Sequence, residues 1–375
     1  MEASLYLHIP FCAGSCGYCD FYSLPVRPGG PGLEAFIDAL LGDVRDYLAR
    51  FAVNRVPTLY LGGGTPSVLG AARITRLLAG LRSLLPAWPE EVTVEANPES
   101  ADAAFLRACW ECGVSRISLG VQTFYEPSRR LVHRVGEGSL LPERLSLVSA
   151  LFPGAFSADL MSGLPGQDET VLLRDIETLL AFNPAHISLY ALTADPKLPG
   201  SPPDDEADRL WLLGRDALEK AGYAQYEVSN FSRPGKRSRH NIRYWRMENW
   251  LGIGPAASGT VIDDHKGTGL RYTVKADAGA YPAPGFAEHD GGITFEFLDR
   301  PTLIKETFLM GFRYTEGPDR ELFKTRFGTE PEALIPRTVE RWRKRGLLEG
   351  GKTALTPGGL LLLNPFLLEV FEELG

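Results

Sequence analysis

Six short strand-like runs alternate with helix-like segments through the first two thirds of this chain. Each run is rich in β-branched, aromatic or aliphatic residues and is short enough to be a buried strand. Strand–helix repeats in series predict an α/β protein, with a parallel sheet and helices outside it. The alternation leaves open whether the sheet closes partly into a barrel or lies open and doubly wound. The predicted strands are Ser4–Ile9, Thr58–Leu61, Val92–Ala96, Arg116–Val121, Phe156–Met161 and Ile187–Leu192.

The chain divides into three predicted parts. Residues 1–231 hold the strand–helix repeats and form the predicted core. Residues 232–299 contain many Gly, Pro, Asn and charged residues, which is typical of an irregular connector. Residues 300–375 regain helical periodicity, with candidate helices at Leu303–Phe312 and Thr338–Arg345. They predict a small, mainly helical C-terminal domain, for which a winged-helix arrangement is one candidate.

Charge and cysteine usage exclude several classes of protein. A net charge of −8 argues against a nucleic-acid partner, because phosphate binding needs clustered Lys and Arg. Met1–Pro10 lacks the basic start and apolar run of a signal peptide. The apolar stretch Leu360–Leu363 is too short to span a bilayer. Five cysteines are an odd count, which disfavours a disulfide framework. We therefore expect a cytoplasmic protein with no transmembrane segment.

Polar or Gly-rich features follow the predicted strands at the same end. Active sites of parallel α/β proteins lie at the carboxyl ends of the strands, so these features are expected to meet there. Taken in strand order, they are His8 and Cys12, then Gly62–Pro66, then Glu95 and Asn97, then Gln122, then Asp159, and finally Tyr190 and Thr193.

Three cysteines follow the first strand with the spacing Cys12-x3-Cys16-x2-Cys19. Thiolates are the usual protein ligands of iron–sulfur clusters, and the glycines between the cysteines would let the loop wrap closely around one. Three thiolates suit a four-iron cluster with one iron left open. A structural zinc site is the alternative, but it needs four ligands, and His8 is the nearby candidate for the fourth.

Other candidate residues also have purely structural interpretations. Cys109 and Cys112 lie three residues apart on a predicted helix, which is more typical of buried structural cysteines than of a second metal site. Gly62–Gly64 could be only a tight turn. Asp159 could be a structural acid, and Arg134 could be a solvated surface charge.

Taken together, these motifs resemble the radical S-adenosylmethionine (radical SAM) family. The cysteine spacing after the first strand is the family signature. Its flanks, Tyr6–Cys12 and Tyr18–Ser23, are similar to the branch that contains oxygen-independent coproporphyrinogen III dehydrogenase (HemN) and the haem chaperone HemW. The resemblance runs from about residue 4 to about residue 260, and more loosely to the end. Further matching stretches are Gly62–Ser67, Gly120–Gln122, Asp159–Gln167, His186–Thr193, Tyr226–Phe231 and His240–Trp245.

The resemblance implies a partial (β/α)6 radical SAM barrel with a HemN-type C-terminal domain at residues 300–375. It implies a [4Fe–4S] cluster on Cys12, Cys16 and Cys19, with SAM on the open iron and an electron donor such as a flavodoxin or ferredoxin. Residues that would contact SAM are Tyr6, Gly63 and Glu95. Residues that match a second SAM site of HemN, or lie near it, are Tyr18, Gly64, Thr65, Gln122, Arg134 and Asp159. Thr193 is a further predicted cofactor-binding residue, and His240 is predicted to bind haem.

The motif His240-Asn241-Ile242-Arg243-Tyr244-Trp245 in the predicted connector is similar to one linked with haem binding in HemW proteins. Imidazole is a standard axial haem ligand, and the two aromatic rings could flank a porphyrin. The alternative is that His240 organises the connector through hydrogen bonds. Relatives commonly carry His where this chain has Ser258, which departs from the family pattern.

Two functions fit this resemblance. The first is a haem chaperone that binds haem and delivers it to client haemoproteins. The second is an oxygen-independent coproporphyrinogen III dehydrogenase, which carries out an oxidative decarboxylation in haem biosynthesis. HemN-type enzymes carry a further Cys where this chain has Phe21, and a longer segment ahead of the cluster than precedes Cys12. The resemblance therefore favours the chaperone, and dehydrogenase activity is not expected.

Overall fold

The computed structural model describes residues 1–26, 30, 32–193, 198–277, 281 and 292–375. Its main sheet contains a run of six parallel strands whose spatial order is also their order along the chain. All six predicted strands are confirmed to within two residues at either end. The strands are β1 (Ser4–Ile9), β4 (Thr58–Gly63), β5 (Glu91–Ala96), β6 (Arg116–Gln122), β7 (Phe156–Ser162) and β8 (His186–Ala191).

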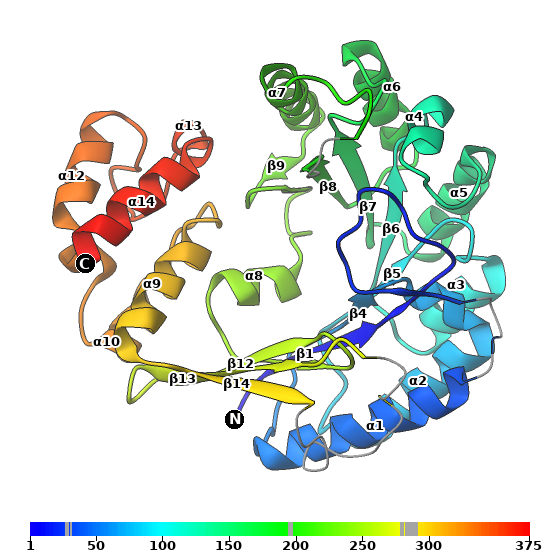
Figure 1. The fold of residues 1–375 in the computed structure, drawn as a ribbon, viewed down its shortest axis with the longest axis horizontal. Coiled ribbons are helices and arrows are strands. Elements are labelled where there is room, and N and C mark those ends of the chain that lie inside the picture. The colour runs from blue at the N-terminus through cyan, green and yellow to red at the C-terminus, as the bar shows by residue number, and fades with distance from the viewer. Residues whose placement is uncertain (27–29, 31, 194–197, 278–280, 282–291) are drawn as a thin grey trace.

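Helices lie on the outside of the parallel strands, and the main hydrophobic core fills the layer between them (Figure 1). Side-chain caps begin two of these helices, because the carboxylates of Asp102 and Asp168 accept the backbone N–H groups of Phe105 and Val171. The helices are α1 (Leu33–Arg50), α2 (Gly70–Leu84), α3 (Ala103–Glu111), α4 (Glu126–Leu131), α5 (Leu141–Leu151), α6 (Glu169–Leu180) and α7 (Asp204–Lys220). Short 3-10 turns stand at Pro66–Leu69 and Gly138–Leu140.

The six parallel strands curve around a common centre, which makes a partial (β/α)6 barrel (Figure 1). Beyond β8 the sheet continues with β10 (Asn230–Ser232) and β9 (Ala224–Gln225), both antiparallel to their neighbours. On its other side β1 pairs in parallel with β11 (Trp250–Ile253). In the described part of the chain, the strand order runs from β14 at one edge to β9 at the other, and these two strands are not paired with each other. The sheet is therefore open and the barrel is incomplete.

The prediction of an irregular connector at residues 232–299 is wrong for most of this segment. It contains helix α8 (Arg239–Trp245), strand β11 and three antiparallel strands that extend the main sheet. Residues 278–280 and 282–291 of the segment lie outside the described residues. The added strands are β12 (Ser258–Asp263), β13 (Thr268–Val274) and β14 (Ile293–Leu298).

Two glycines that suggested loops are instead inside these strands, where neighbouring atoms leave no room for a side chain. A Cβ atom on Gly252 would lie 2.2 Å from the carbonyl oxygen of Ser258. A Cβ on Gly259 would lie 2.3 Å from the ring of Tyr272, which is buried against Tyr47 of α1. Glycine within a strand often marks such a close approach, and composition cannot distinguish this from a loop.

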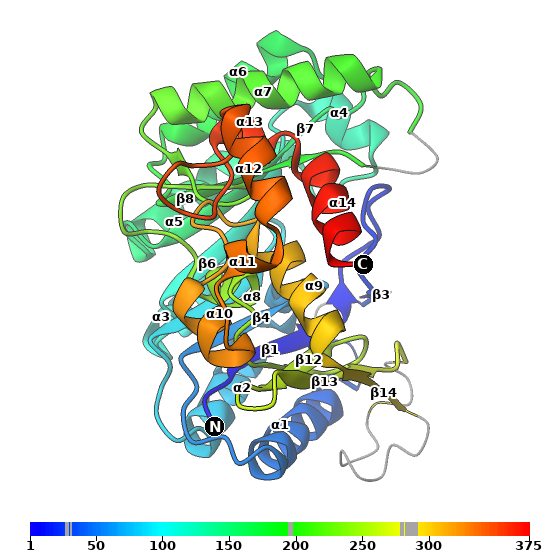
Figure 2. The same cartoon turned by 90° about the vertical axis from the view of Figure 1, so that its left-hand side faces the viewer.

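The C-terminal part is mainly helical, as predicted, and has a hydrophobic core of its own around Phe308, Trp342 and Phe366. Figures 1 and 2 show its helices grouped beside the end of the sheet that carries β12–β14. An isolated bridge joins Leu348 and Leu355. The winged-helix assignment stays a prediction. The helices are α9 (Arg300–Gly311), α10 (Arg320–Phe327), α11 (Pro331–Leu334), α12 (Pro336–Lys344), α13 (Pro357–Leu360) and α14 (Leu363–Leu374).

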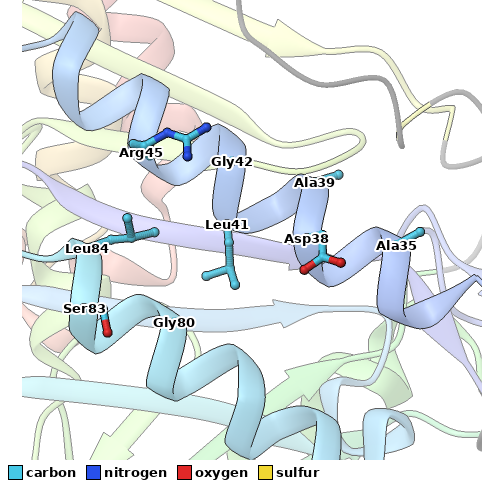
Figure 3. A pocket seen from close by; sticks show the side chains of 9 residues that line it. All are labelled: Ala35, Asp38, Ala39, Leu41, Gly42, Arg45, Gly80, Ser83 and Leu84. Carbon is cyan, nitrogen blue, oxygen red and sulfur yellow. The ribbon is translucent and has the colours of Figure 1, made fainter.

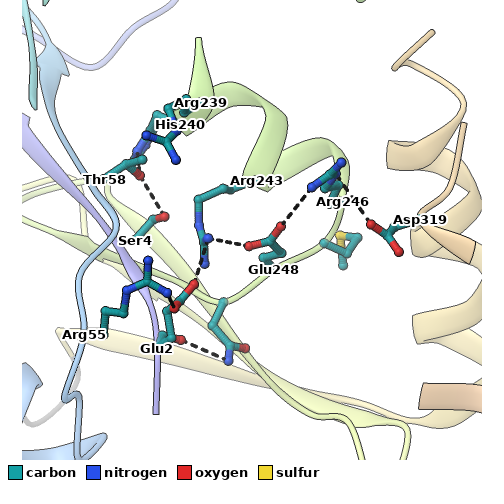
Figure 4. A network of polar contacts seen from close by, with 12 residues as sticks. Glu2, Ser4, Arg55, Thr58, Arg239, His240, Arg243, Arg246, Glu248 and Asp319 are labelled. Carbon is teal, nitrogen blue, oxygen red and sulfur yellow. Dashed lines mark hydrogen bonds and ion pairs between the residues drawn. The ribbon is translucent and has the colours of Figure 1, made fainter. Parts of the chain in front are cut away.

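A chain of ion pairs connects the first residues of the protein to this helical part (Figure 4). Arg243 of α8 contacts Glu2 at 2.9 Å and Glu248 at 2.6 Å. Arg246 continues the chain to Asp319, the capping residue of α10, at 3.6 Å. Single surface pairs contribute little to stability, typically ~0–1 kcal/mol, but this network joins three segments that are far apart in the sequence.

A surface pocket of about 580 Å³ lies between α1 and α2 and is lined by Leu41, Leu84, Asp38 and Arg45 together with small residues (Figure 3). None of its lining residues belongs to the predicted site. Throughout the described part of the chain, every helix is too short or too polar to cross a lipid bilayer.

Replacing Gly259 with Ala tests the packing of the added strands. The new methyl group would meet the rigid ring of Tyr272, so the free energy of unfolding should fall by about 1–3 kcal/mol. Denaturant unfolding measures this. Gly350→Ala is the matched control, because no atom lies within 4 Å of its added Cβ position. Equal stability of the two variants would contradict the close approach.

Candidate functional site

The three cysteines of the motif lie on one loop at the carboxyl end of β1. Cys12 ends the short strand β2 (Phe11–Cys12), which pairs with β3 (Leu24–Pro25) on the far side of the loop. The backbone N–H of Gly17 donates to the carbonyl of Val132 at 2.8 Å, which ties the loop to the segment after α4. All three thiols are free. Among the described residues, no three Cys, His, Asp or Glu side chains are already gathered around one metal position.

The thiols lie close enough to affect one another. Burial raises the pKa of Cys19, and the neighbouring Cys16 and Cys12 raise it further. Thiolates are the usual protein ligands of iron–sulfur clusters, and a bound iron would stabilise the thiolate form of each cysteine.

A chain of polar contacts connects the thiols of Cys12 and Cys16 through residues at the ends of neighbouring strands. The hydroxyl of Thr65 lies 3.1 Å from Cys12 Sγ, and Arg134 Nη1 lies 3.6 Å from Cys16 Sγ. Asn97 connects them, because its Nδ2 donates to Thr65 Oγ1 at 2.9 Å and its Oδ1 accepts from Arg134 Nη2 at 2.8 Å. Arg134 is therefore no solvated surface charge. The sequence placed Asn97 at a predicted strand end but indicated no role for it. In the structure, Asn97 connects Thr65 to Arg134.

The Gly62–Gly64 run is more than a tight turn, because three different neighbours approach its backbone. Added Cβ atoms on these residues would lie 2.9 Å from Glu95 Cδ, 2.5 Å from His8 Cε1 and 2.5 Å from the carbonyl oxygen of Phe11, respectively. Gly63 also has a φ of 109°, which glycine adopts without strain. The run holds the cluster loop and the end of β5 against each other.

Glu95 lies at the centre of the predicted SAM side. Its Oε1 accepts the hydroxyl of Tyr60 at 2.6 Å and its Oε2 accepts the backbone N–H of Gly63 at 3.1 Å. Burial raises its pKa to about 7, against the lowering effect of these two hydrogen bonds and with a further rise from Asp159. Tyr6 is close by, with its ring 6.1 Å from that of Tyr60. Tyr6, Gly63 and Glu95 therefore lie close together, and their contact with SAM stays a prediction.

The residues expected near a second SAM are spread along the same strand ends. Burial raises the pKa of Asp159, which accepts a hydrogen bond from Ser118 at 3.4 Å. Gln122 has a positive φ of 68° at a register shift between β6 and β7, so the strand bends at this point. Tyr18 packs with Val132 in a small apolar cluster beside the cluster loop. Thr193 is exposed and follows β8.

His240 lies at the other end of the strands. Its Nδ1 is 2.8 Å from the hydroxyl of Thr58, the first residue of β4, and its Nε2 is 3.0 Å from the hydroxyl of Tyr244. Its backbone N–H donates to Glu91 at 2.9 Å. The side chain is buried, and burial lowers its pKa to about 3. Both ring nitrogens thus have partners inside the protein, and the structure does not bring His240 to the cysteines.

Cys109 and Cys112 lie at the outer helix α3 and its C-terminal cap. Cys109 is fully buried in the main core, and burial raises its pKa. Neither of them lies on the cluster loop, which favours the interpretation of structural cysteines.

The raised pKa of Glu95 predicts a pH dependence of stability. An acid whose pKa is about 7 when folded and 4.5 when unfolded stabilises the fold below pH ~4.5, and this stabilisation is lost as the pH rises through about 7. Glu95→Gln removes the titration. The unfolding free energy of the unchanged protein, relative to this variant, should therefore fall between pH 5 and pH 8 in denaturant titrations. A difference that stays constant over this range would contradict the burial of the charge.

Comparisons with known proteins show which family this chain is similar to. Residues 6–179 match the family model described as the Radical SAM superfamily, and residues 298–362 match that of the HemN C-terminal domain. A protein of Escherichia coli named heme chaperone HemW is 35% identical over 98% of this chain and 97% of its own length. A mouse protein named radical S-adenosyl methionine domain-containing protein 1, mitochondrial, is 37% identical over 100% of this chain and 88% of its own length.

A solved structure of coproporphyrinogen III oxidase (HemN) from Escherichia coli has the same fold. It matches with a TM-score of 0.81 over 98% of this chain and 90% of that chain, at 22% sequence identity. The likeness extends through the strands added after α8 and the C-terminal helices. Both the barrel with its cysteine loop and the full-length relatives lead to one conclusion: the chain belongs to the radical SAM superfamily, in the HemN/HemW branch.

Proposed function

We propose that this chain is a haem chaperone that binds haem and delivers it to client haemoproteins. The observation that carries the proposal is similarity along the whole chain to relatives named heme chaperone HemW, at 35% identity in Escherichia coli and 33% in Lactococcus lactis. Membership of the radical SAM family implies a [4Fe–4S] cluster and SAM. An electron donor such as a flavodoxin or ferredoxin, and a cytoplasmic location, belong to the same proposal.

Cys12, Cys16 and Cys19 are the proposed cluster ligands. Three free thiols on one loop supply the donor set, and Thr65 and Arg134 contact two of the sulfur atoms. The zinc alternative is disfavoured because both ring nitrogens of His8, the candidate fourth ligand, are hydrogen-bonded to other groups. When bound, the cluster would supply the electron that reductively cleaves SAM.

The SAM residues are proposed from chemistry and position. Glu95 offers carboxylate oxygens that suit an ammonium or ribose hydroxyl group, and Tyr6 and Gly63 lie beside it. Arg134 suits a carboxylate through charge-assisted hydrogen bonds. Further residues proposed to line the cofactor site are Tyr18, Gly64, Thr65, Gln122, Asp159 and Thr193.

The dehydrogenase alternative is less well supported by the sequence around the cysteines. HemN-type enzymes have a further Cys where this chain has Phe21, and the Phe21 side chain is 70% exposed. This difference supports the chaperone.

For His240 we propose the structural role. Iron ligation would require it to leave Thr58 or Tyr244 and to emerge from a fully enclosed position. Leaving a buried polar group without its partner costs about 1–3 kcal/mol, which an axial bond would have to offset.

Cysteine variants test the cluster ligands. After anaerobic reconstitution, the unchanged chain should carry about four irons, and Cys12→Ala, Cys16→Ala or Cys19→Ala should bring iron close to zero. Cys112→Ala is the matched control and should keep full iron, measured by colorimetric iron and sulfide assay. Iron loss in the control that equals the loss in the loop variants would refute the assignment.

An anaerobic assay with reconstituted protein, SAM and reductant tests the function. The protein should bind haem with a defined stoichiometry, read from absorption spectra, and should form no vinyl groups from coproporphyrinogen III. Vinyl formation would establish the dehydrogenase instead.

The same spectra test His240. His240→Ala should retain the haem spectrum and lower the free energy of unfolding by about 1–3 kcal/mol through lost buried hydrogen bonds. A shifted haem spectrum with unchanged protein stability would identify His240 as the ligand after all.

A further inference from the structure

We propose that His8 is a positioning residue that couples the SAM side of the site to the cluster loop. The proposal rests on the proposed roles of Tyr6 and the three cysteines. His8 lies on β1, and one ring nitrogen contacts the hydroxyl of Tyr6 at 3.0 Å while the other contacts the carbonyl of Tyr22 at 2.9 Å. The ring of Tyr6 lies 6.1 Å from that of Tyr60, whose hydroxyl donates to Glu95, and Tyr22 lies three residues after Cys19 on the loop.

The partners determine which nitrogen carries the proton. The carbonyl of Tyr22 can only accept, so Nε2 of His8 must donate to it. Burial lowers the pKa of His8, so the ring is neutral and Nδ1 has no hydrogen. Nδ1 therefore accepts the hydroxyl proton of Tyr6. A single ring thus receives a hydrogen bond from the SAM side and donates one to the cluster loop.

Packing prevents this ring from turning away. His8 is 5% exposed. A Cβ atom on Gly63 would lie 2.5 Å from its Cε1, and one on Gly254 would lie 2.6 Å from its carbonyl oxygen. Gly63 of β4 therefore lies against the ring, and Gly254, which follows β11, lies against the backbone of His8. A displacement of the Tyr6 hydroxyl must be followed by the ring or must break a hydrogen bond.

Two backbone hydrogen bonds hold the C-terminal end of the loop to its beginning. Leu24 N donates to the carbonyl of Pro10 at 2.6 Å, and Val26 N donates to that of Cys12 at 2.8 Å, both through the β2–β3 pair. The hydrogen bond from His8 joins the Tyr22 carbonyl to β1 of the barrel, and the rings of the two residues lie 6.5 Å apart. It sets the path of the chain directly after the last cysteine.

Two substitutions separate the two hydrogen bonds. Glutamine can place its amide nitrogen near the position of Nε2, so His8→Gln can keep the donor to Tyr22 while it loses the acceptor for Tyr6. Asparagine can place its carbonyl oxygen near Nδ1, so His8→Asn can keep the acceptor and lose the donor. Tyr6→Phe removes the Tyr6 hydroxyl without touching the loop.

The first readout needs no cofactor. Hydrogen–deuterium exchange of the peptide that covers residues 20–26 should be faster in His8→Asn than in His8→Gln. Only His8→Asn loses the hydrogen bond to the Tyr22 carbonyl, so the backbone N–H groups of this loop should open to solvent more often. His186→Gln is the matched control. It alters another buried histidine with two hydrogen-bonded ring nitrogens, to Ser157 and Tyr226, and should leave this peptide unchanged. Equal exchange in the two His8 variants would overturn the loop-anchoring role.

The second readout uses the reconstituted protein. His8→Gln and Tyr6→Phe should keep their iron, bind SAM roughly three- to tenfold more weakly, and reduce alike any shift that SAM causes in the cluster's reduction potential. The double variant should lose no more than either single one. Additive losses would overturn the coupling. If the unchanged protein binds neither iron nor SAM, the proposed function fails instead, whereas the exchange result still tests the anchor.

Discussion

Two backbone hydrogen bonds hold the cysteine loop to the end of the parallel sheet. Gly64 N donates to the carbonyl of Ile9 at 2.8 Å, and Thr65 N donates to that of Phe11 at 2.6 Å. They continue the pairing of β1 with β4 past the last strand residues, so the loop leaves the sheet in a fixed direction. They are possible because Gly64 has no side chain, as a Cβ would lie 2.5 Å from the Phe11 oxygen. The positions of the three thiols, of Thr65 and of His8 all follow from this close approach.

Strand β1 is also what joins the two halves of the protein. It pairs with β4 on one side and with β11 on the other, so the added strands and the helices after them continue the same sheet. Arg271 of β13 forms a paired contact with Glu306 of α9, and Arg326 of α10 donates to the carbonyl of Met247 at 3.0 Å. The C-terminal helices are thus held in place by secondary structure and buried charge together, and they are not tethered by a loose connector.

Sequence predicted the six parallel strands because their apolar runs are bounded by polar and glycine residues at one common end. It failed for residues 232–299, where Gly252 and Gly259 serve tight packing and not chain reversal. The family resemblance supplied the candidate cofactor residues, but it could not decide between the roles of His240. The structural role that we propose for His240 rests on Thr58, which is 182 residues away along the chain, and on the hydroxyl of Tyr244. Asn97 and His8 were visible as polar residues at strand ends, yet their partners could be identified only in the folded chain.

The departure from the family pattern at Ser258 has a structural account. Ser258 stands opposite Thr273 across the β12–β13 pair, and their hydroxyls lie 2.8 Å apart. The carbonyl of Ser258 accepts the indole N–H of Trp250 at 3.1 Å and lies against Gly252. Serine therefore completes the cross-strand pairing of β12 with β13 at this position through both its hydroxyl and its carbonyl group.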